Sequence, residues 1–448
     1  MKSIGNALRL VSITLVLLLV LAACGNSQNA ESNKSNEPAK PADESKPAAE
    51  EKVTLKVMFQ KGEGDGADPL HDWMQENVKL YKEQNAHVDF EVVANTSSDN
   101  YLTVITTKMA ANDLPDIFQG WTLERMRPFA ESGRIYDLSQ EISAYPDWQE
   151  NLPETGLDAT TFDGGIYGIP LEMAVEPVFY NKKVFADNGL EVPTTYEQFL
   201  NIVDVLSAAG ITPVTVPNKE PWVGSILYST IFERIAGLDV YQKTVMDGEG
   251  SWTDEPFIEA GRYIQDLAKR GAFDSNMNSI GMEEAEIKLA EGKAGMYLQG
   301  TWSVPSMIER LGDNVGYFNF PDIAGGEGSS KSFMILPNSA LSISNNSKNK
   351  EEAIKFMKFI FSQERQLEFA KSGYLTFYKT KIAEGDIPML NQEILDGLSE
   401  ATGFMYPWDV PLGVFMGKEL NNATQSIYTG IEPEVAFERL QKSADSQK

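Results

Sequence analysis

The fold class of this 448-residue chain is decided by the stretch VTLKVMF, which spans residues 53–59. Apolar and polar residues alternate at its start and it then becomes continuously apolar, which predicts a strand that enters the interior of a sheet. A helical pattern follows over residues 70–84, a strand pattern over 88–93 and a second helical pattern over 101–111. Strands that alternate with helices predict an α/β fold with a parallel sheet.

The rest of the chain continues this alternation. Thr194 and Glu197 have the spacing of a capping box and predict the start of a helix that carries apolar residues at helical spacing through Leu206. The other expected helices span residues 257–269, 283–290, 350–361 and 434–441, and the expected short strands span 178–180, 295–298, 315–318 and 341–343. With 42% hydrophobic residues, a chain of this length is expected to form two or more lobes.

The N-terminal residues predict an exported protein. An apolar run over residues 11–21 follows Lys2 and Arg9, as in a secretory signal. The single cysteine, Cys24, comes directly after the sequence Leu-Ala-Ala. This arrangement resembles a bacterial lipobox, in which the chain is cut before the cysteine and the cysteine is acylated. We therefore expect residues 1–23 to be a signal peptide and Cys24 to carry a lipid anchor.

One alternative is that residues 1–23 form an uncleaved anchor helix. The apolar run is shorter than the roughly 20 residues that a membrane-spanning helix needs, which disfavours this alternative. Residues 25–52 contain no large apolar residue, and this composition is typical of a disordered tether. The lipid is then the only expected contact with the membrane, and the globular part begins at Val53.

Composition excludes several classes of function. The formal net charge is −27, which disfavours nucleic acid as a partner because phosphate binding depends on Lys and Arg. The chain has two histidines, His71 and His87, and beyond Cys24 no thiol, so no metal site is expected. No serine nucleophile elbow or phosphate-binding glycine loop occurs either. We expect no cofactor and no enzyme activity.

Four segments together resemble the family 1 extracellular solute-binding proteins of bacterial ABC importers, the group that includes maltose-binding protein. They occur in the same order as in that family, and the resemblance covers nearly all of residues 53–443. The segments are LPDIFQGW at 114–121, DGGIYGIP at 163–170, FYNK at 179–182, and EGKAGM at 291–296 followed by GTW at 300–302.

The resemblance implies a two-lobe, type II periplasmic-binding-protein-like α/β fold with discontinuous lobes and a ligand cleft at the hinge. Lobe one is expected to contain residues 53–170 and 333–385, and lobe two residues 171–332 and 386–443. The family captures its ligand by closing the cleft and delivers it to the transmembrane permease subunits of the importer. The expected protein is a monomer on the extracellular face of the cell membrane, with a carbohydrate as its ligand.

Four tryptophans are candidates for stacking on a sugar ring, because sugars present apolar C–H faces to flat aromatic rings. The resemblance places Trp302 and Trp222 at positions where the family stacks aromatic residues. Trp121 is displaced by about one residue from the usual aromatic, and Trp408 lies where the alignment is uncertain. The alternative interpretation is that these large aromatic residues pack in the core or between the lobes.

Four carboxylates are candidates for accepting sugar hydroxyl hydrogens. Glu172 lies eight residues before Tyr180, where the family often has an aspartate that contacts sugar, and Glu176 on the same crossover is its alternative. Glu63 and Asp65 follow the first strand, in a loop that the family uses to touch ligand. Solvated turn residues are an equally good interpretation of that second pair.

Two alternative functions stay open at this stage. A glycoside hydrolase also uses paired carboxylates and tryptophans, but Glu172 and Glu176 cannot be assigned as acid and nucleophile. A binding protein of the same fold could instead take a non-sugar or an acidic oligomer, for which positively charged residues are needed. The candidates for that role are Lys61, Lys108, Arg125 and Arg127.

Overall fold

The computed structural model describes residues 51–60, 69–95, 98–337 and 339–447. The expected signal peptide, the lipidated Cys24, the tether, Lys61, Glu63 and Asp65 lie outside the described residues. Residues 51–448 form one compact unit.

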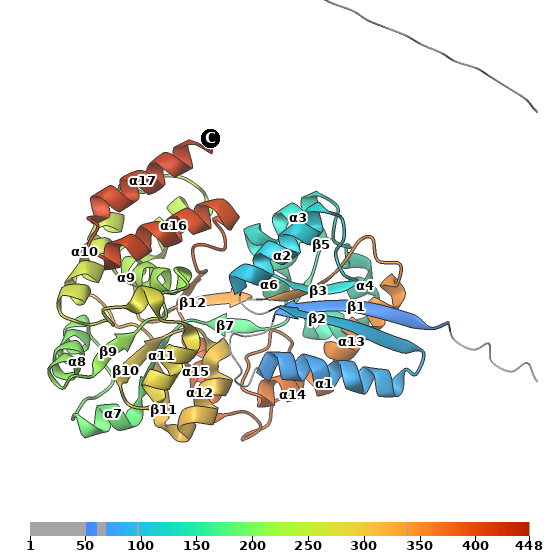
Figure 1. Cartoon of the computed structure of the whole chain (residues 1–448), viewed down its shortest axis with the longest axis horizontal. Helices are drawn as coiled ribbons and strands as arrows, with labels where there is room; N and C mark the ends of the chain where they lie inside the picture. The colour runs from blue at the N-terminus through green and yellow to red at the C-terminus, as the bar shows by residue number, and fades with distance from the viewer. Residues whose placement is uncertain (1–50, 61–68, 96–97, 338, 448) are drawn as a thin grey trace, which may run out of the picture. The chain divides into compact units, whose positions relative to one another are not determined.

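A five-stranded sheet forms the centre of the first lobe (Figure 1). In spatial order its strands are β2 (Val88–Asn95), β1 (Val53–Gln60), β3 (Ile117–Gly120), β13 (Ala340–Ile343) and β6 (Ile169–Pro170). The first three strands are parallel, with Val53 opposite Val88, whereas β13 runs antiparallel to both of its neighbours. The predicted parallel sheet is therefore wrong in part, because β13 returns from the second lobe and enters the sheet in the opposite direction.

Helices cover both faces of this sheet. They are α1 (Pro69–Gln84), α2 (Ser98–Ala110), α3 (Arg127–Glu131), α4 (Ser139–Ala144), α5 (Pro146–Asn151), α6 (Glu154–Leu157), α13 (Lys350–Ile360) and α14 (Gln363–Lys371). In β1, Val57 and Phe59 pack with α1 and α13, while Met58 packs with α2 on the opposite face. The continuously apolar end of VTLKVMF thus reflects burial on both sides of the strand.

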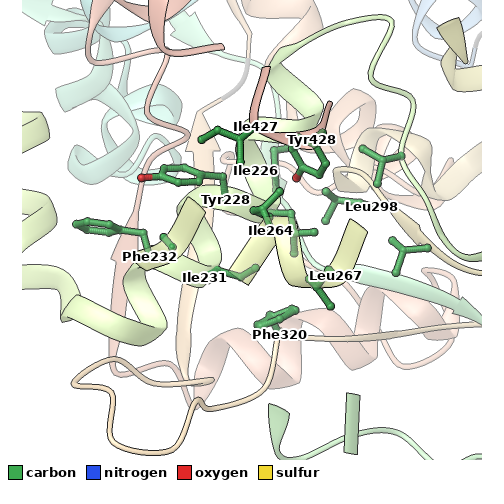
Figure 2. Close-up of a cluster of buried hydrophobic side chains, with 14 of the residues drawn as sticks. Ile226, Tyr228, Ile231, Phe232, Ile264, Leu267, Leu298, Phe320, Ile427 and Tyr428 are labelled. Carbon is green, nitrogen blue, oxygen red and sulfur yellow. The ribbon is translucent and has the colours of Figure 1, made fainter. Parts of the chain in front are cut away.

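The second lobe has a four-stranded mixed sheet with its own helices. Its strands, in spatial order, are β11 (Val315–Phe318), β8 (Val178–Asn181), β10 (Ala294–Leu298) and β9 (Thr212–Thr215). Its helices are α7 (Lys182–Asp187), α8 (Tyr196–Ala208), α9 (Trp222–Tyr241), α10 (Glu255–Lys269), α11 (Met282–Ala290), α12 (Val304–Leu311), α15 (Met389–Ser399), α16 (Gly413–Tyr428) and α17 (Pro433–Asp445). Figure 2 shows the core in which Tyr228 of α9, Ile264 of α10, Leu298 of β10 and Tyr428 of α16 pack together.

A short three-stranded sheet connects the two lobes. Its central strand β12 (Ser332–Pro337) pairs with β7 (Met173–Val175) on one side and β14 (Gly403–Met405) on the other. β7 leads from β6 in the first sheet to β8 in the second, and β12 leads back to β13. The chain therefore crosses between the lobes on β7 and β12, and we call these two the crossover strands. The predicted residue boundaries of the lobes stay a prediction.

Short elements complete the described chain. They are the 3₁₀ turns η1 (Leu123–Arg125), η2 (Asp158–Thr160), η4 (Met277–Ser279), η5 (Thr301–Ser303) and η6 (Gly312–Asn314), the π-helical turn η3 (Gln242–Met246), and the hairpin of β4 (Thr161–Phe162) with β5 (Gly165–Ile166). In the described residues no helix is long and apolar enough to span a bilayer.

The capping box of α8 lies one residue later than predicted. Thr195, not Thr194, is the N-cap, and its side chain accepts a hydrogen bond from the Gln198 backbone N–H. The Gln198 side chain accepts in return from the Thr195 N–H. Glu197, the predicted partner, is exposed in the first turn. The pattern allowed both registers because two threonines are adjacent and Glu and Gln both fit a capping box.

Candidate functional site: a cleft beside the crossover strands

A pocket lies at the carboxyl ends of β1 and β3, where open α/β sheets place their ligands. The residues that line it are Gln60, Tyr101, Gln119, Gly120, Trp121 and Ser339. Gln60 ends β1, Gly120 ends β3, and Ser339 lies just before β13, so three strands of the first sheet contribute to the pocket.

Hydrogen bonds hold the floor of this pocket in place. The Gln119 side chain accepts from the Gln60 backbone N–H at 2.9 Å, and the Tyr101 hydroxyl lies 2.7 Å from the Gln119 carbonyl oxygen. Burial raises the pKa of Tyr101 well above its usual value, so this hydroxyl stays protonated. Among the described residues, the buried Ser339 Oγ has no hydrogen-bond partner. An unpaired buried hydroxyl is costly, which favours an interaction with a polar ligand.

Trp121 stands at the edge of the pocket with its ring 5.6 Å from that of Tyr101, in an edge-to-face arrangement. It is partly buried against the α2 side of the first core. The structure thus places this predicted stacking residue at a polar pocket with part of its ring accessible.

Trp302 and Trp222 lie next to each other on the second lobe, with ring centroids 5.7 Å apart. Trp302 belongs to η5, directly after β10, and Trp222 is the first residue of α9. A Cβ on Gly300 would lie 2.3 Å from the Trp302 ring, so only glycine lets the ring fold back over the chain here. Trp222 is oriented by its Nε1–H, which donates to Glu220 at 2.8 Å. Both rings are partly buried.

Trp302 also contacts the crossover strands. It packs on a small apolar cluster, which we call the crossover cluster, together with residues from both lobes. The members of the cluster are Leu123, Ala174, Trp302, Leu336, Tyr406 and Val410. Leu123 has a φ of 54°, which costs free energy for a bulky side chain and is typical of functional segments. The crossover cluster therefore joins η1 of the first lobe to Trp302 and the segment before α16 of the second.

An ion pair lies beside this cluster. Arg125 of η1 donates to Asp409 through Nη2 at 2.8 Å, and the two side chains are 17% and 8% exposed. Asp409 also accepts from Asn421 Nδ2 at 3.1 Å. Burial, and to a smaller extent the charge of Asp409, raises the pKa of the nearby Glu176 carboxyl well above its usual value. Glu176 Oε2 has no hydrogen-bond partner among the described residues.

The structure places Glu172 on the same crossover as Glu176. It is buried between β6 and β7, where the Leu171 N–H donates to the Ser339 carbonyl and the Met173 N–H donates to the Leu375 carbonyl. Both carboxylates thus lie on the chain segment that links the lobes. Whether they contact ligand stays a prediction.

Trp408 does not fit its predicted role as a stacking residue. It is 1% exposed and lies in the core of the second lobe. Five aromatic rings lie within 6.3 Å of its own. They belong to Tyr228, Phe232, Tyr241, Trp252 and Phe257. No face of the indole is left for a sugar, so the alternative interpretation of Trp408 as a packing residue is correct.

Two groups of residues near the site were not predicted from sequence. Gln60 and Gln119 line the pocket, and their position as polar residues at the ends of buried strands was the available signal. Phe415, in the first turn of α16, is 49% exposed. It follows Gly413, where a Cβ would lie 3.7 Å from the Glu124 side chain of η1. The sequence carries no signal for the position of Phe415, because its exposure and its position relative to η1 depend on how α16 packs.

Residues 67–367 match the family model described as bacterial extracellular solute-binding protein. The chain belongs to this family. The family consists of solute-binding proteins of ABC importers, so the predictions of the family and of a protein that is not an enzyme are confirmed.

Curated relatives of this solute-binding protein are similar over most of their length. The multiple sugar-binding protein of Streptococcus mutans is 25% identical over 367 residues, which cover 80% of this chain and 78% of the relative. The diacetylchitobiose-binding protein DasA of Streptomyces coelicolor is 24% identical over 368 residues, with the same coverage of both chains.

Solved structures share the fold of this solute-binding protein. A chitin oligosaccharide binding protein superimposes with a TM-score of 0.80 at 24% identity, covering 88% of this chain and 98% of the other. The maltose/maltodextrin-binding domain MalE of Bdellovibrio bacteriovorus superimposes with a TM-score of 0.71 at 18% identity, covering 88% and 99%. These similarities confirm the predicted two-lobe, type II periplasmic-binding fold.

Proposed function

We propose that this solute-binding protein captures a carbohydrate, specifically an oligosaccharide, in the cleft beside the crossover strands and delivers it to an ABC permease. The observation that carries the proposal is the position of Trp121, Trp222 and Trp302. Trp121 borders a pocket lined by amides and hydroxyls. Trp222 and Trp302 form a pair, of which Trp302 belongs to the crossover cluster. Aromatic faces with uncharged polar groups suit the C–H faces and hydroxyls of sugars.

The relatives support a sugar as the ligand, because the names of both curated relatives given above denote sugar binding. In the proposed mechanism a ligand that contacts both lobes favours the closed arrangement, since its binding free energy is largest there. The permease then recognises the closed form.

We further propose that Cys24 is lipidated and holds the protein at the extracellular face of the membrane as a monomer. The support is the Leu-Ala-Ala-Cys sequence at the end of the apolar run. Cys24→Ser should move the protein from the membrane fraction to the medium, whereas a membrane-bound variant would contradict lipid anchoring.

Binding is tested by titration calorimetry with chito-, malto- and xylo-oligosaccharides. We expect saturable binding without consumption of the sugar. Trp302→Ala should weaken it by about 2 kcal/mol, or about thirtyfold in Kd, as for the truncation of a central aromatic contact. Tyr263→Ala, which removes a partly buried aromatic side chain of α10 that packs on Tyr196, is the control and should leave Kd unchanged. No response to any of the sugars would refute the proposed function.

A further inference from the structure

The charges around the proposed site bear on which carbohydrates it accepts. Arg125 is the candidate cation that lies next to the crossover cluster, two residues after Leu123 in η1. Its charge is already matched, because Asp409 accepts from it at 2.8 Å and both side chains are largely buried. Buried ion pairs of this kind resist exchange with an external partner, since breaking one leaves an uncompensated buried charge.

Asp409 is itself held in position. Asn421 donates to it, and the Asn421 side-chain oxygen accepts from Ser225 of α9 at 2.8 Å. The carboxylate therefore cannot turn away from Arg125 without losing this network. Arg125 Nε is buried without a hydrogen-bond partner among the described residues, but Asp409 neutralises the guanidinium charge, so a ligand carboxylate would have to compete with Asp409 for it.

The other charges near the site do not favour an anion. Glu172 and Glu176 are both buried on the crossover and offer no positive charge, and the six residues that line the pocket are all uncharged. Beside Trp222, Lys219 and Glu220 supply one charge of each sign.

Two of the other cations that the sequence offered for an acidic ligand, Lys108 and Arg127, have acidic partners within their own lobe, and Lys61 lies outside the described residues. Arg127 forms two hydrogen bonds of 2.6 Å with Glu124, and Lys108 pairs with Asp113 at 3.2 Å. In the described part of the chain, Lys108, Arg125 and Arg127 are thus each paired with a carboxylate of the protein.

We propose that the site selects neutral oligosaccharides over acidic ones, and that Asp409 determines this selectivity by neutralising Arg125. The inference rests on the proposed function and specifies its substrate class. Asp409 is a positioning residue in this scheme because it acts through Arg125. Removal of its charge makes the guanidinium group available to a ligand carboxylate, with which an arginine can form charge-assisted hydrogen bonds.

The test compares Kd for matched neutral and acidic probes with the full chain in detergent at pH 7. Suitable pairs are galactose with galacturonate, glucose with glucuronate, and their oligomers of two to four units. We expect the wild-type protein to bind neutral probes at least about tenfold more tightly, because a ligand carboxylate that loses its hydration without gaining a cationic partner is disfavoured. Acidic probes that bind equally well or more tightly would overturn the inference without affecting the proposed function.

Substitutions of Asp409 and Arg125 then test whether Asp409 determines this selectivity. Asp409→Asn should strengthen binding of the acidic probes by about tenfold or more and change Kd of the neutral probes by less than about threefold. The double variant Arg125→Gln/Asp409→Asn should lose that gain. Asp89→Asn is the matched control, since it removes one negative charge from an exposed pair with Lys82 near the opposite end of the first sheet.

Each outcome has a defined meaning. If Asp409→Asn folds, as judged by its melting temperature, and gains no affinity for acidic probes, the assignment to Asp409 is wrong. If it does not fold, Arg125→Gln decides the question, because an unmatched Asp409 should weaken acidic binding further. If neither class of probe binds the wild-type protein, the proposed function fails and this inference fails with it.

Discussion

The buried ion pair of Arg234 and Glu233 should be a main determinant of the stability of the second lobe. The two side chains are 0% and 1% exposed and pair within α9. Arg234 Nε also donates to the Phe320 carbonyl at 2.9 Å, and Nη2 lies 3.3 Å from the carbonyl of Ser332, the first residue of β12. The guanidinium group thus links α9 by hydrogen bonds to Phe320 and to the start of the crossover strand β12.

Arg234→Met keeps the apolar stem and removes the charge. Removing one partner of a buried pair costs about 3–5 kcal/mol, and each carbonyl that loses its donor adds about 1 kcal/mol. These contributions overlap, and we expect a net loss of about 4 kcal/mol in the free energy of unfolding. For a compact unit of roughly 400 residues, an unfolding entropy near 2.1 cal/mol/K per residue converts this loss to a fall in Tm of about 5 °C.

Scanning calorimetry and urea unfolding would measure this loss. The double variant Glu233→Gln/Arg234→Met should recover at least half of it, because the buried carboxylate is no longer left unpaired. Arg262→Met, which breaks exposed pairs with Glu255 and Glu434, is the control and should cost about 1 kcal/mol or less. A loss below about 1 kcal/mol for Arg234→Met would refute the reasoning.

Two further predictions concern the site and its surroundings. Glu176 has a raised pKa in the folded protein, so wild-type stability should fall as pH rises from the ordinary value of 4.5 through the raised pKa. Glu176→Gln should lack this loss. The difference in Tm between variant and wild type should therefore grow over that interval, and a constant difference would contradict a raised pKa. Trp408→Phe should lower Tm, because it leaves space in a closed core. It should leave the sugar Kd within about twofold, as measured by calorimetry below both melting temperatures, and a large loss of affinity would restore the stacking role.

Local patterns in the sequence were sufficient to predict most of the secondary structure. The stretch 53–59 became β1 (Val53–Gln60), and the strand expected at 315–318 is β11. These elements are recognisable because burial of one or both faces leaves a period in the sequence. The direction of β13 has no such signal, since it depends on where the chain returns from the other lobe.

The surroundings of single side chains were harder to predict for the same reason. Trp408 and Trp302 both follow short turn-like sequences, yet one is enclosed by five aromatic rings and the other lies partly exposed beside the crossover strands. Their difference arises from the packing of α9 and α10 around Trp408. A tryptophan in a loop context therefore indicates a binding residue only once the helices around it are placed.

The crossover cluster gives a physical reason for a link between ligand contact and movement of the lobes. Trp302 packs on Ala174 of β7 and Leu336 of β12, and the Val175 N–H donates to the Thr301 hydroxyl at 3.1 Å. In the proposed mechanism, a sugar that stacks on Trp302 would therefore contact a side chain that packs on both crossover strands. Leu123 lies in the same cluster with a backbone conformation that costs about 1–3 kcal/mol. Because that cost is comparable to the contribution of one good ligand contact, a change of backbone conformation at Leu123 would, under the proposed mechanism, be large enough to shift the balance between an open and a closed arrangement.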